Sequence, residues 1–169
     1  MTDTKELRIA PLAEGDIAAV IELAGLIWRR HYPGIISMEQ IDYMLGQRYT
    51  PAVILGQLHS GSAWWDEAFV GERLVGFAQY ELYGASSMKL DKLYLHPDVQ
   101  RQGYGGRVLV HIEEQARRRG LDSVRLNVNK HNVKSIAAYR KSGYDVVEEV
   151  VADIGKGFVM DDYVMEKIL

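Results

Sequence analysis

The sequence predicts a mixed α/β layer structure, with helices packed on a sheet, in a single domain spanning residues 1–169. Three observations support this fold class. Short apolar stretches typical of strands alternate with segments whose apolar residues recur at helical spacing. Two predicted strands meet across Gly71-Glu72, a hairpin signal that indicates antiparallel pairing. Another predicted strand runs into a glycine-rich stretch that opens an amphipathic helix, which places a ligand loop at the end of a central strand.

The first third of the chain predicts one short strand, residues 7–9, followed by three helices. The helices begin at residues that favour N-cap positions, namely Asp16, Ser37 and Thr50. A glutamine three residues after Ser37 completes a capping box, and the proline after Thr50 suits the first position of a helix. Pro33 ends the first helix, because proline lacks the backbone N–H that a continuing helix needs.

The rest of the chain predicts six strands and two helices. The strands are expected at residues 63–69, 73–82, 88–95, 124–128, 144–151 and 158–168. One helix follows the glycine-rich stretch and ends at Gly120, and the other begins at the N-cap Asn132 and ends at Gly143.

Composition excludes several function classes. Hydrophobic residues make up 47% of the chain, charged residues 25%, and the net charge is −3, so we expect neither nucleic-acid binding nor a membrane partner. The chain has no cysteine, which removes disulfides, thiolate zinc sites and a cysteine nucleophile. The five histidines lack ligand spacing, so no metal site is predicted. A polar N-terminus without a signal-peptide core leads us to expect a cytoplasmic protein.

Residues 99–109 (VQRQGYGGRVL) carry Gly103, Gly105 and Gly106 between a strand and a helix. Glycines here allow a ligand to approach the backbone, and a helix N-terminus attracts phosphate. A dinucleotide fold would need a sixth-position glycine, where this chain has Val108, and a Walker loop would need Gly-Lys-Ser/Thr, which is absent. The stretch therefore predicts a pyrophosphate site of another kind.

The pattern Gln100-x-x-Gly103-x-Gly105, after a strand ending in Leu-Tyr-Leu-His-Pro, resembles the acetyl-coenzyme A loop of the GCN5-related N-acetyltransferases, the GNAT family. A second segment, residues 132–144 (NVKSIAAYRKSGY), resembles the family's run of an asparagine, a tyrosine seven residues on, and Lys-x-Gly-aromatic. The resemblance covers residues 69–169. The ending of the chain looks most like the polyamine (spermidine/spermine) acetyltransferases, whereas the first 65 residues match the family at no identifiable position.

The resemblance implies a mostly antiparallel sheet of six to seven strands with helices on both faces. It also implies transfer of the acetyl group of acetyl-coenzyme A to a primary amine, expected to be a small molecule such as a polyamine, by direct attack in a ternary complex. A homodimer is a further expectation. Two alternatives stay open: a catalytically silent module that binds a coenzyme A ester, and an acetyltransferase of protein N-termini or lysines.

By resemblance, Tyr139 is the acid that protonates the leaving thiolate; the alternative is a core tyrosine. Asp91 is the candidate base, because alternation places it on one strand face with Leu93 and Leu95, where apolar surroundings would raise its pKa. The polyamine-type relatives have glutamate at the matching place. The alternative for Asp91 is an ion pair with Lys89 or Arg125.

The remaining expected contacts belong to the coenzyme and the acceptor. The backbones of Leu93, Tyr94 and Leu95 would bind the acetyl oxygen and the pantetheine amides, at a bulge that the family has in this strand. The pyrophosphate would be wrapped by Gln100, Arg101, Gln102, Gly103, Tyr104, Gly105 and Gly106, the phosphate loop. Asn132 would bond the coenzyme arm or act as a plain N-cap.

Aromatic residues in the first third, Trp28 and Tyr32, are candidate acceptor-binding residues because aromatic faces suit a cationic ligand, although both also suit a core. Acidic residues that could attract a polyamine are Glu81, Asp145, Glu148, Asp161 and Asp162.

Overall fold

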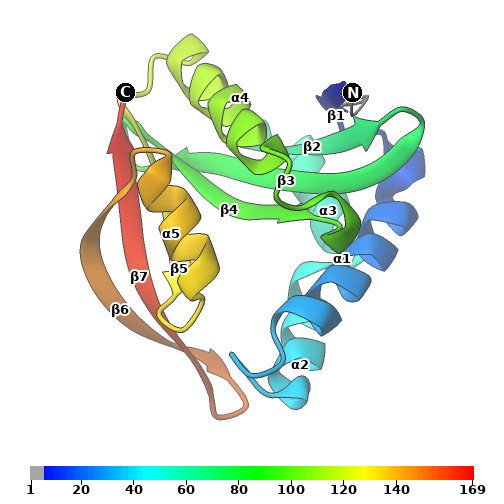
Figure 1. Ribbon diagram of the computed structural model, residues 1–169, viewed down its shortest axis with the longest axis vertical. Coiled ribbons are helices and arrows are strands. Elements are labelled where there is room, and N and C mark those ends of the chain that lie inside the picture. Colours follow the sequence, from blue (N-terminus) through cyan, green and yellow to red (C-terminus); the bar gives the residue numbers. More distant parts are fainter. Residues whose placement is uncertain (1–5) are drawn as a thin grey trace.

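A computed structural model describes residues 6–169 of the chain. Seven strands form one sheet in the order β1-β2-β3-β4-β5-β7-β6 (Figure 1). Only the β4–β5 pair is parallel among these neighbours. The strands are β1 (Leu7–Pro11), β2 (Ala63–Val70), β3 (Arg73–Tyr83), β4 (Ser87–Leu95), β5 (Ser123–Asn129), β6 (Asp145–Gly155) and β7 (Phe158–Ile168).

Helices cover both faces of this sheet (Figure 1). They are α1 (Ile17–His31), α2 (Met38–Arg48), α3 (Pro51–His59), α4 (Tyr104–Arg118) and α5 (Val133–Lys141), with 3₁₀ turns η1 (Glu14–Asp16) and η2 (Pro97–Val99). One core joins α1, α2 and α3 to the sheet through Trp28, Trp65 and Phe77. The other joins α4 and α5 to the opposite face, around Ile112 and Leu126. The predicted fold class is confirmed, as are the seven strands and five helices.

Two of the predicted N-caps form and two do not. The Ser37 and Thr50 side chains accept hydrogen bonds from the backbone N–H groups of Gln40 (3.1 Å) and Val53 (3.2 Å). Asp16 and Asn132 occupy N-cap positions, yet neither side chain caps its helix. The side-chain role predicted for these two residues is therefore wrong. At Asn132 the reason is a competing partner, described below.

The central strands β4 and β5 diverge, and this divergence positions the functional site (Figure 1). Their parallel pairing joins residues 87–90 to residues 123–126 and goes no further. On its other side β4 stays paired with β3, but the register shifts: Gln79 pairs with Lys92 while Tyr80 pairs with Leu90. Asp91 is the extra residue of this bulge. Beyond it, the β4 edge that faces β5 has no strand partner among residues 6–169, so backbone N–H groups there are open to a ligand.

Gly76 of β3 allows β3 to approach the end of β4 closely. A Cβ on Gly76 would lie 2.6 Å from the carbonyl oxygen of Tyr94 and 2.6 Å from a methyl carbon of Leu95. Because the first of these atoms is backbone, no rotamer change could relieve the clash. Gly76 thus helps to fix the position of the open edge of β4.

Candidate active site

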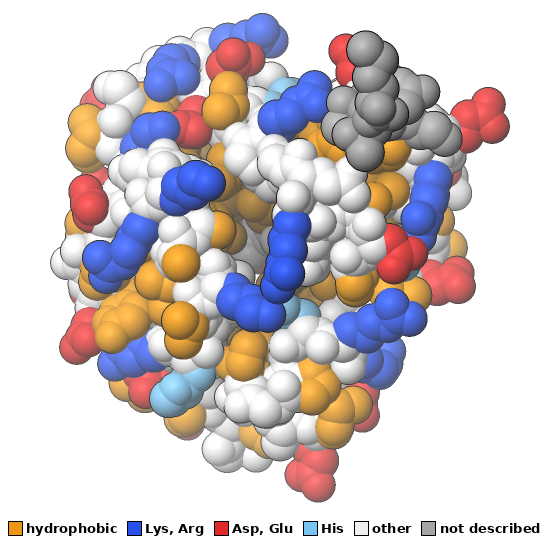
Figure 2. Space-filling model, viewed as in Figure 1, with side chains coloured by type: hydrophobic (Ala, Val, Ile, Leu, Met, Phe, Trp, Pro, Cys, Tyr) orange, Lys and Arg blue, Asp and Glu red, His pale blue; other side chains and the backbone are white. Residues whose placement is uncertain are grey.

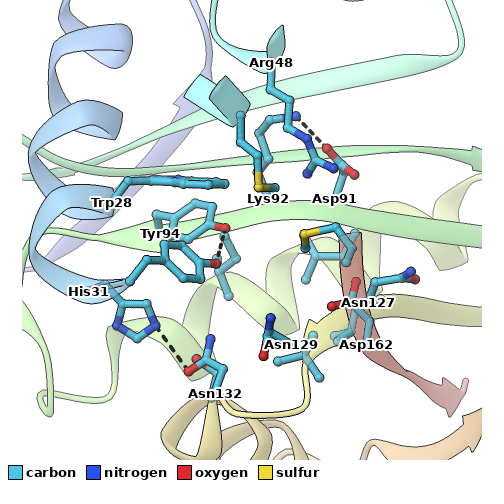
Figure 3. Close-up of a pocket in the computed structure, with 18 of the residues that line it drawn as sticks. Trp28, His31, Arg48, Asp91, Lys92, Tyr94, Asn127, Asn129, Asn132 and Asp162 are labelled. Carbon is cyan, nitrogen blue, oxygen red and sulfur yellow. Dashed lines mark hydrogen bonds and ion pairs between the residues drawn. The ribbon is translucent and has the colours of Figure 1, made fainter. Parts of the chain in front are cut away.

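A cavity of about 320 Å³ lies where β4 and β5 separate (Figure 3). Residues from β4 and β5 form its floor. Helix α5 contributes Ser135 and Tyr139 together with its N-cap residue Asn132, and aromatic residues of α1 and its neighbours form one wall. Helix α2 and the β6–β7 hairpin close a further side, which we call the α2–hairpin wall; its residues are Met44, Arg48, Ala152, Ile154, Met160 and Asp162. Many of the site residues predicted from the sequence line this cavity, namely Trp28, Tyr32, Asp91, Leu93, Tyr94, Leu95, Gln100, Asn132 and Tyr139.

The aromatic wall consists of Trp28 of α1, Tyr32 directly after that helix, and Tyr94 of β4. The Tyr32 and Tyr94 hydroxyls share a hydrogen bond of 2.8 Å, and the Trp28 ring lies 4.6 Å and 5.7 Å from those two rings. Trp28 is only 2% exposed, so it is a core residue that also touches the cavity. Burial raises the pKa of both tyrosines, which keeps their hydroxyls protonated at neutral pH.

The side chain of Asn132 bonds to His31 rather than to its own helix. His31 Nε2 donates to Asn132 Oδ1 over 3.2 Å, which ties the end of α1 to the start of α5 (Figure 3). Burial lowers the pKa of His31, the Asn132 bond opposes this, and Lys134 lowers it further, so the imidazole is neutral at pH 7. This contact was not predicted from the sequence, where the five histidines were assessed only as possible metal ligands.

Tyr139 lines the cavity from α5, and its ring packs 6.0 Å from the ring of Tyr144. Within residues 6–169 its hydroxyl makes no hydrogen bond. Burial, and then the neighbouring Tyr32, raise the pKa of Tyr139. The hydroxyl therefore keeps its proton at neutral pH and is free to donate it to a ligand in the cavity. The two roles weighed for Tyr139, core residue and proton donor, are compatible in this position.

Asp91 has a partner that the sequence reasoning did not anticipate. The bulge brings Asp91 Oδ2 within 2.5 Å of Lys92 Nζ (Figure 3). Lys92 is 3% exposed, lies 5.4 Å from the centre of the Tyr49 ring, and also donates to Gln79. Burial alone would raise the pKa of Asp91, but Lys92, with Arg48 and Lys89, holds it below its ordinary value. The expectation of a raised pKa for this carboxyl is contradicted.

The alternative partners suggested for Asp91 are also contradicted. Arg125 instead pairs with Glu166 (3.4 Å) and Glu148 (3.6 Å), and Lys89 forms no ion pair within residues 6–169. Alternation along a regular strand would put Asp91 and Lys92 on opposite faces. A bulge breaks that alternation, and no pattern in the sequence located it at this residue.

Asp162 and Arg48 face the same cavity from the α2–hairpin wall (Figure 3). Asp162 is 4% exposed, and its Oδ1 atom is buried without a hydrogen-bond partner. Burial raises the pKa of Asp162 to about 6, although Arg48 and Asn127 act in the opposite direction. Arg48 forms no hydrogen bond or ion pair with residues 6–169. Of the five acidic residues that could attract a polyamine, Asp162 alone lines this cavity.

Apart from Gln100, the residues of the phosphate loop do not line the cavity, and the loop has the backbone shape its sequence suggests. Arg101 and Gly103 have positive φ angles, 64° and 81°, so consecutive N–H groups turn toward one side ahead of α4. A Cβ on Gly103 or Gly106 would meet no atom within 4 Å, which leaves room for a bound group. The face that carries α4 and α5 shows Lys and Arg side chains bordering a hollow (Figure 2). These features fit a diphosphate.

Side chains of the phosphate loop contribute unequally. Gln100 Nε2 donates to the Leu95 carbonyl over 3.1 Å and so links the loop to the end of β4. Arg101 and Gln102 are exposed, whereas Tyr104 is 3% exposed in the core beneath α4. The contact predicted between Tyr104 and the pyrophosphate can therefore involve only the backbone of Tyr104, because its side chain is buried.

Comparison with known proteins places the chain in a family. A model of the acetyltransferase (GNAT) family matches residues 26–144, well over half of the chain, so the chain belongs to this family. Acetyl-coenzyme A is the acyl donor of these enzymes, which confirms the co-substrate expected from the sequence. The finer question of the acceptor is taken up below.

Individual relatives agree with this assignment. A spermidine N(1)-acetyltransferase from Thermoplasma acidophilum is 26% identical over 159 residues, covering 92% of this chain and 96% of the relative. The PaiA N-acetyltransferase of T. acidophilum, solved in complex with coenzyme A, has a TM-score of 0.83 at 26% identity, with 97% and 99% of the two chains covered. A GCN5-related N-acetyltransferase from Rhodopseudomonas palustris has a TM-score of 0.79 at 24% identity, covering 100% and 98%.

Two kinds of site are absent from the described part of the chain. Residues 6–169 hold no group of three or more His, Cys, Asp or Glu side chains arranged to bind a metal ion. No helix in that range is long and apolar enough to cross a membrane.

Proposed function

We propose that this protein transfers the acetyl group of acetyl-coenzyme A to the primary amine of a small molecule, by direct attack in a ternary complex. One observation carries the proposal: a single cavity at the open edge of β4 contains an unpaired proton donor, Tyr139, and two carboxylates, Asp91 and Asp162. The phosphate loop begins beside the same edge, where Gln100 bonds to Leu95.

Acetyl transfer needs three catalytic functions that these residues can supply. The amine must lose a proton to attack the thioester carbon, since a free alkylamine has a pKa of about 10.4. The carbonyl oxygen gains charge and needs N–H donors, which the unpaired edge of β4 at Leu93, Tyr94 and Leu95 offers. The C–S bond then breaks, and the thiolate takes a proton, which we assign to Tyr139.

Asp91 is our candidate for the group that receives the amine proton, directly or through water. Its ion pair with Lys92 keeps it ionised but lowers its pKa, which weakens it as a base. Asp162, whose pKa is about 6, faces the same cavity and is better matched to neutral pH. The pH dependence of turnover for Asp91→Asn and Asp162→Asn decides between them. Only the variant that lacks the base should lose the fall in turnover at low pH that protonation of the base causes.

The α2–hairpin wall supports a small acceptor rather than a protein chain. Tyr43 of α2 donates its hydroxyl to the Ile154 carbonyl of β6 (2.7 Å), and Gln40 donates to the Val159 carbonyl of β7 (2.9 Å). These bonds join α2 to the tip of the hairpin, and the two lie together in Figure 1. A polypeptide passing through the cavity would have to displace this contact.

A polyamine is the acceptor suggested by the sequence resemblance and by the name of the T. acidophilum relative. Asp91 and Asp162 would favour an ammonium group. Arg48, Lys89 and Lys92 line the same cavity, however, and oppose a polycation. We therefore propose a primary amine as the acceptor class and keep spermidine as a test compound within it.

The experiment measures thiol release from acetyl-coenzyme A with polyamines, amino acids, aminoglycosides and short peptides, for the wild type and Tyr139→Phe. If Tyr139 is the acid, the variant should lose about 10²–10⁴ in turnover and keep its affinity for coenzyme A. A silent coenzyme A ester-binding module would bind the coenzyme and acetylate no amine in the panel. That outcome would refute the proposed function.

A further inference from the structure

The cavity carries more positive than negative charge. Its ionisable lining comprises Arg48, Lys89 and Lys92 against Asp91 and Asp162, while His31 is neutral. Lys92 and Asp91 neutralise each other across 2.5 Å. Two cations, Arg48 and Lys89, and one carboxylate, Asp162, then remain without an ion-pair partner among residues 6–169. A ligand bearing only ammonium groups leaves both cations uncompensated.

Arg48 is built to receive an anion. It is the last residue of α2, half-buried, and its guanidinium points into the cavity near Asp91 (Figure 3). A guanidinium offers five N–H donors in a planar fork that matches a carboxylate. Leaving those donors without acceptors in a half-buried position costs free energy, and a bound carboxylate would recover it.

The backbone at Arg48 is held in place by its neighbour. Tyr49 is 3% exposed and packs its ring against Trp28 (5.8 Å), Trp65 (6.2 Å) and Phe77 (5.8 Å). Helix α2 is in turn bonded to the hairpin through Gln40 and Tyr43. Arg48 thus projects from a rigid base, which reduces the entropy lost when it binds a ligand.

Asp162 supplies the opposite charge from the facing strand β7. Its buried Oδ1 lacks a donor, and it forms no ion pair with Arg48 although both line one cavity. A buried, unsatisfied carboxylate oxygen calls for an N–H donor from a ligand. The cavity therefore presents an anion-binding fork and an amine-binding oxygen that do not satisfy each other.

We propose that the acceptor is an amino carboxylate, whose carboxylate is bound by Arg48 and whose amine faces Asp162 and the acetyl donor. This inference rests on the proposed acetyltransferase function and narrows its substrate class. Lys89 adds a further positive charge to the lining of the same cavity. The acceptor is a molecule with both groups, which neither a polyamine nor a simple alkylamine provides.

The test uses matched pairs of compounds that differ by one carboxylate: ornithine and putrescine, lysine and cadaverine, tyrosine and tyramine, 4-aminobutyrate and propylamine. Wild-type kcat/KM should be higher for the carboxylate member of at least one pair. Arg48→Ala should lower that value by about 10- to 100-fold, mainly through KM, because it removes a hydrogen bond between charged groups. The same variant should leave turnover of the decarboxylated partner unchanged or faster.

Two further variants sharpen the result. Arg48→Lys keeps the charge without the fork and should recover only part of the loss. Arg30→Ala removes an exposed arginine of α1 that does not line the cavity, and it should change neither compound of a pair. Circular dichroism and thermal unfolding check that each variant folds.

Calorimetric titration of the same pairs into the protein loaded with coenzyme A separates the two proposals. Binding of an amino carboxylate that Arg48→Ala abolishes, without any acetylation, supports the carboxylate-binding role of Arg48 and refutes the proposed function. Preference for spermidine, putrescine or cadaverine, unaffected by Arg48→Ala, refutes the inference and leaves the proposed function standing. Absence of binding or turnover for every amino carboxylate also overturns the inference.

Discussion

The two sides of the cleft between β4 and β5 use different parts of the chain. The phosphate loop is one contiguous stretch whose shape comes from backbone angles at Arg101 and Gly103. The α2–hairpin wall with the β4 bulge instead brings together ionisable side chains from three distant segments: Arg48, the Asp91–Lys92 pair and Asp162. A site whose contacts come from the backbone tolerates substitution of its side chains. A site whose contacts come from side chains can change its ligand preference when one residue is substituted.

The largest expected effect concerns the Asp91–Lys92 pair. Removing one member of a buried ion pair leaves the other charge unpaired, so Asp91→Ala should lower the free energy of unfolding by about 3–5 kcal/mol. Denaturant unfolding measures this loss. The double variant Asp91→Asn/Lys92→Met removes both charges and should recover most of the stability.

The double variant also separates stability from catalysis. If Asp91 accepts the amine proton, the double variant should fold well and still lose about 10²–10⁴ in turnover. A stable double variant with wild-type turnover would show that the pair is structural, and Asp162 would then be the better candidate for the base.

On the backbone-built side, Gly103→Ala should matter more than changes to exposed side chains. Its φ of 81° costs an L-residue about 1–2 kcal/mol, so the variant should bind coenzyme A about 5- to 30-fold more weakly. Arg101→Ala and Gln102→Ala keep the backbone and should change the affinity less. Calorimetry with coenzyme A compares the three, and equal losses would contradict a site built by the backbone.

Gly46→Ala is the matched control for Gly103→Ala. Gly46 lies within α2, has no positive φ, and a Cβ there would meet no atom within 4 Å. The substitution should stabilise the helix by about 0.5–1 kcal/mol and leave the affinity for coenzyme A unchanged.

The side-chain-built wall should also make stability depend on pH through Asp162. Its pKa is about 6 in the folded protein against 3.8 ordinarily, so the folded state disfavours the ionised carboxylate. That cost is fully present above about pH 6 and vanishes as the pH falls below the unfolded pKa. Asp162→Asn should therefore raise the melting temperature at pH 8, by about 2–4 °C per kcal/mol relieved, and have little effect at pH 4. If Asp162→Asn were less stable than the wild type at pH 8, ionised Asp162 would not destabilise the folded state, and the prediction would be wrong.

The difference between the two sides also explains what the sequence could predict. The phosphate loop and the segment from Asn132 to Tyr139 are each one contiguous stretch, so their resemblance to the GNAT family indicated a coenzyme site. The periodicity of apolar residues, together with capping residues and stop glycines, located the seven strands and five α-helices of residues 6–169, because strands and helices bury different repeats. Capping was predicted correctly at Ser37 and Thr50, where no distant residue competes for the side chain.

Predictions failed where a long-range contact or an irregularity in a strand determined the outcome. Asn132 does not cap its helix because His31, 101 residues earlier, takes its side-chain oxygen. The pKa of Asp91 is lowered because a bulge brings Lys92 to the same side of the strand. Arg48 and Asp162 are separated by more than a hundred residues, and no local pattern marks them as neighbours of one cavity.

The smallest expected effect tests whether the wall between α2 and the hairpin restricts the acceptor. Tyr43→Phe removes the hydroxyl that donates to the Ile154 carbonyl and should cost about 0.5–1.5 kcal/mol of stability. The KM for the acceptor should rise, since the wall opens, while the KM for acetyl-coenzyme A on the far side of the cleft should stay constant. Gly155→Ala offers an independent check, because its Cβ would lie 2.5 Å from the same hydroxyl. If either variant shifted the acetyl-coenzyme A constant as strongly as the acceptor constant, the two sides would be coupled through α2, and their separation into independent halves would be wrong.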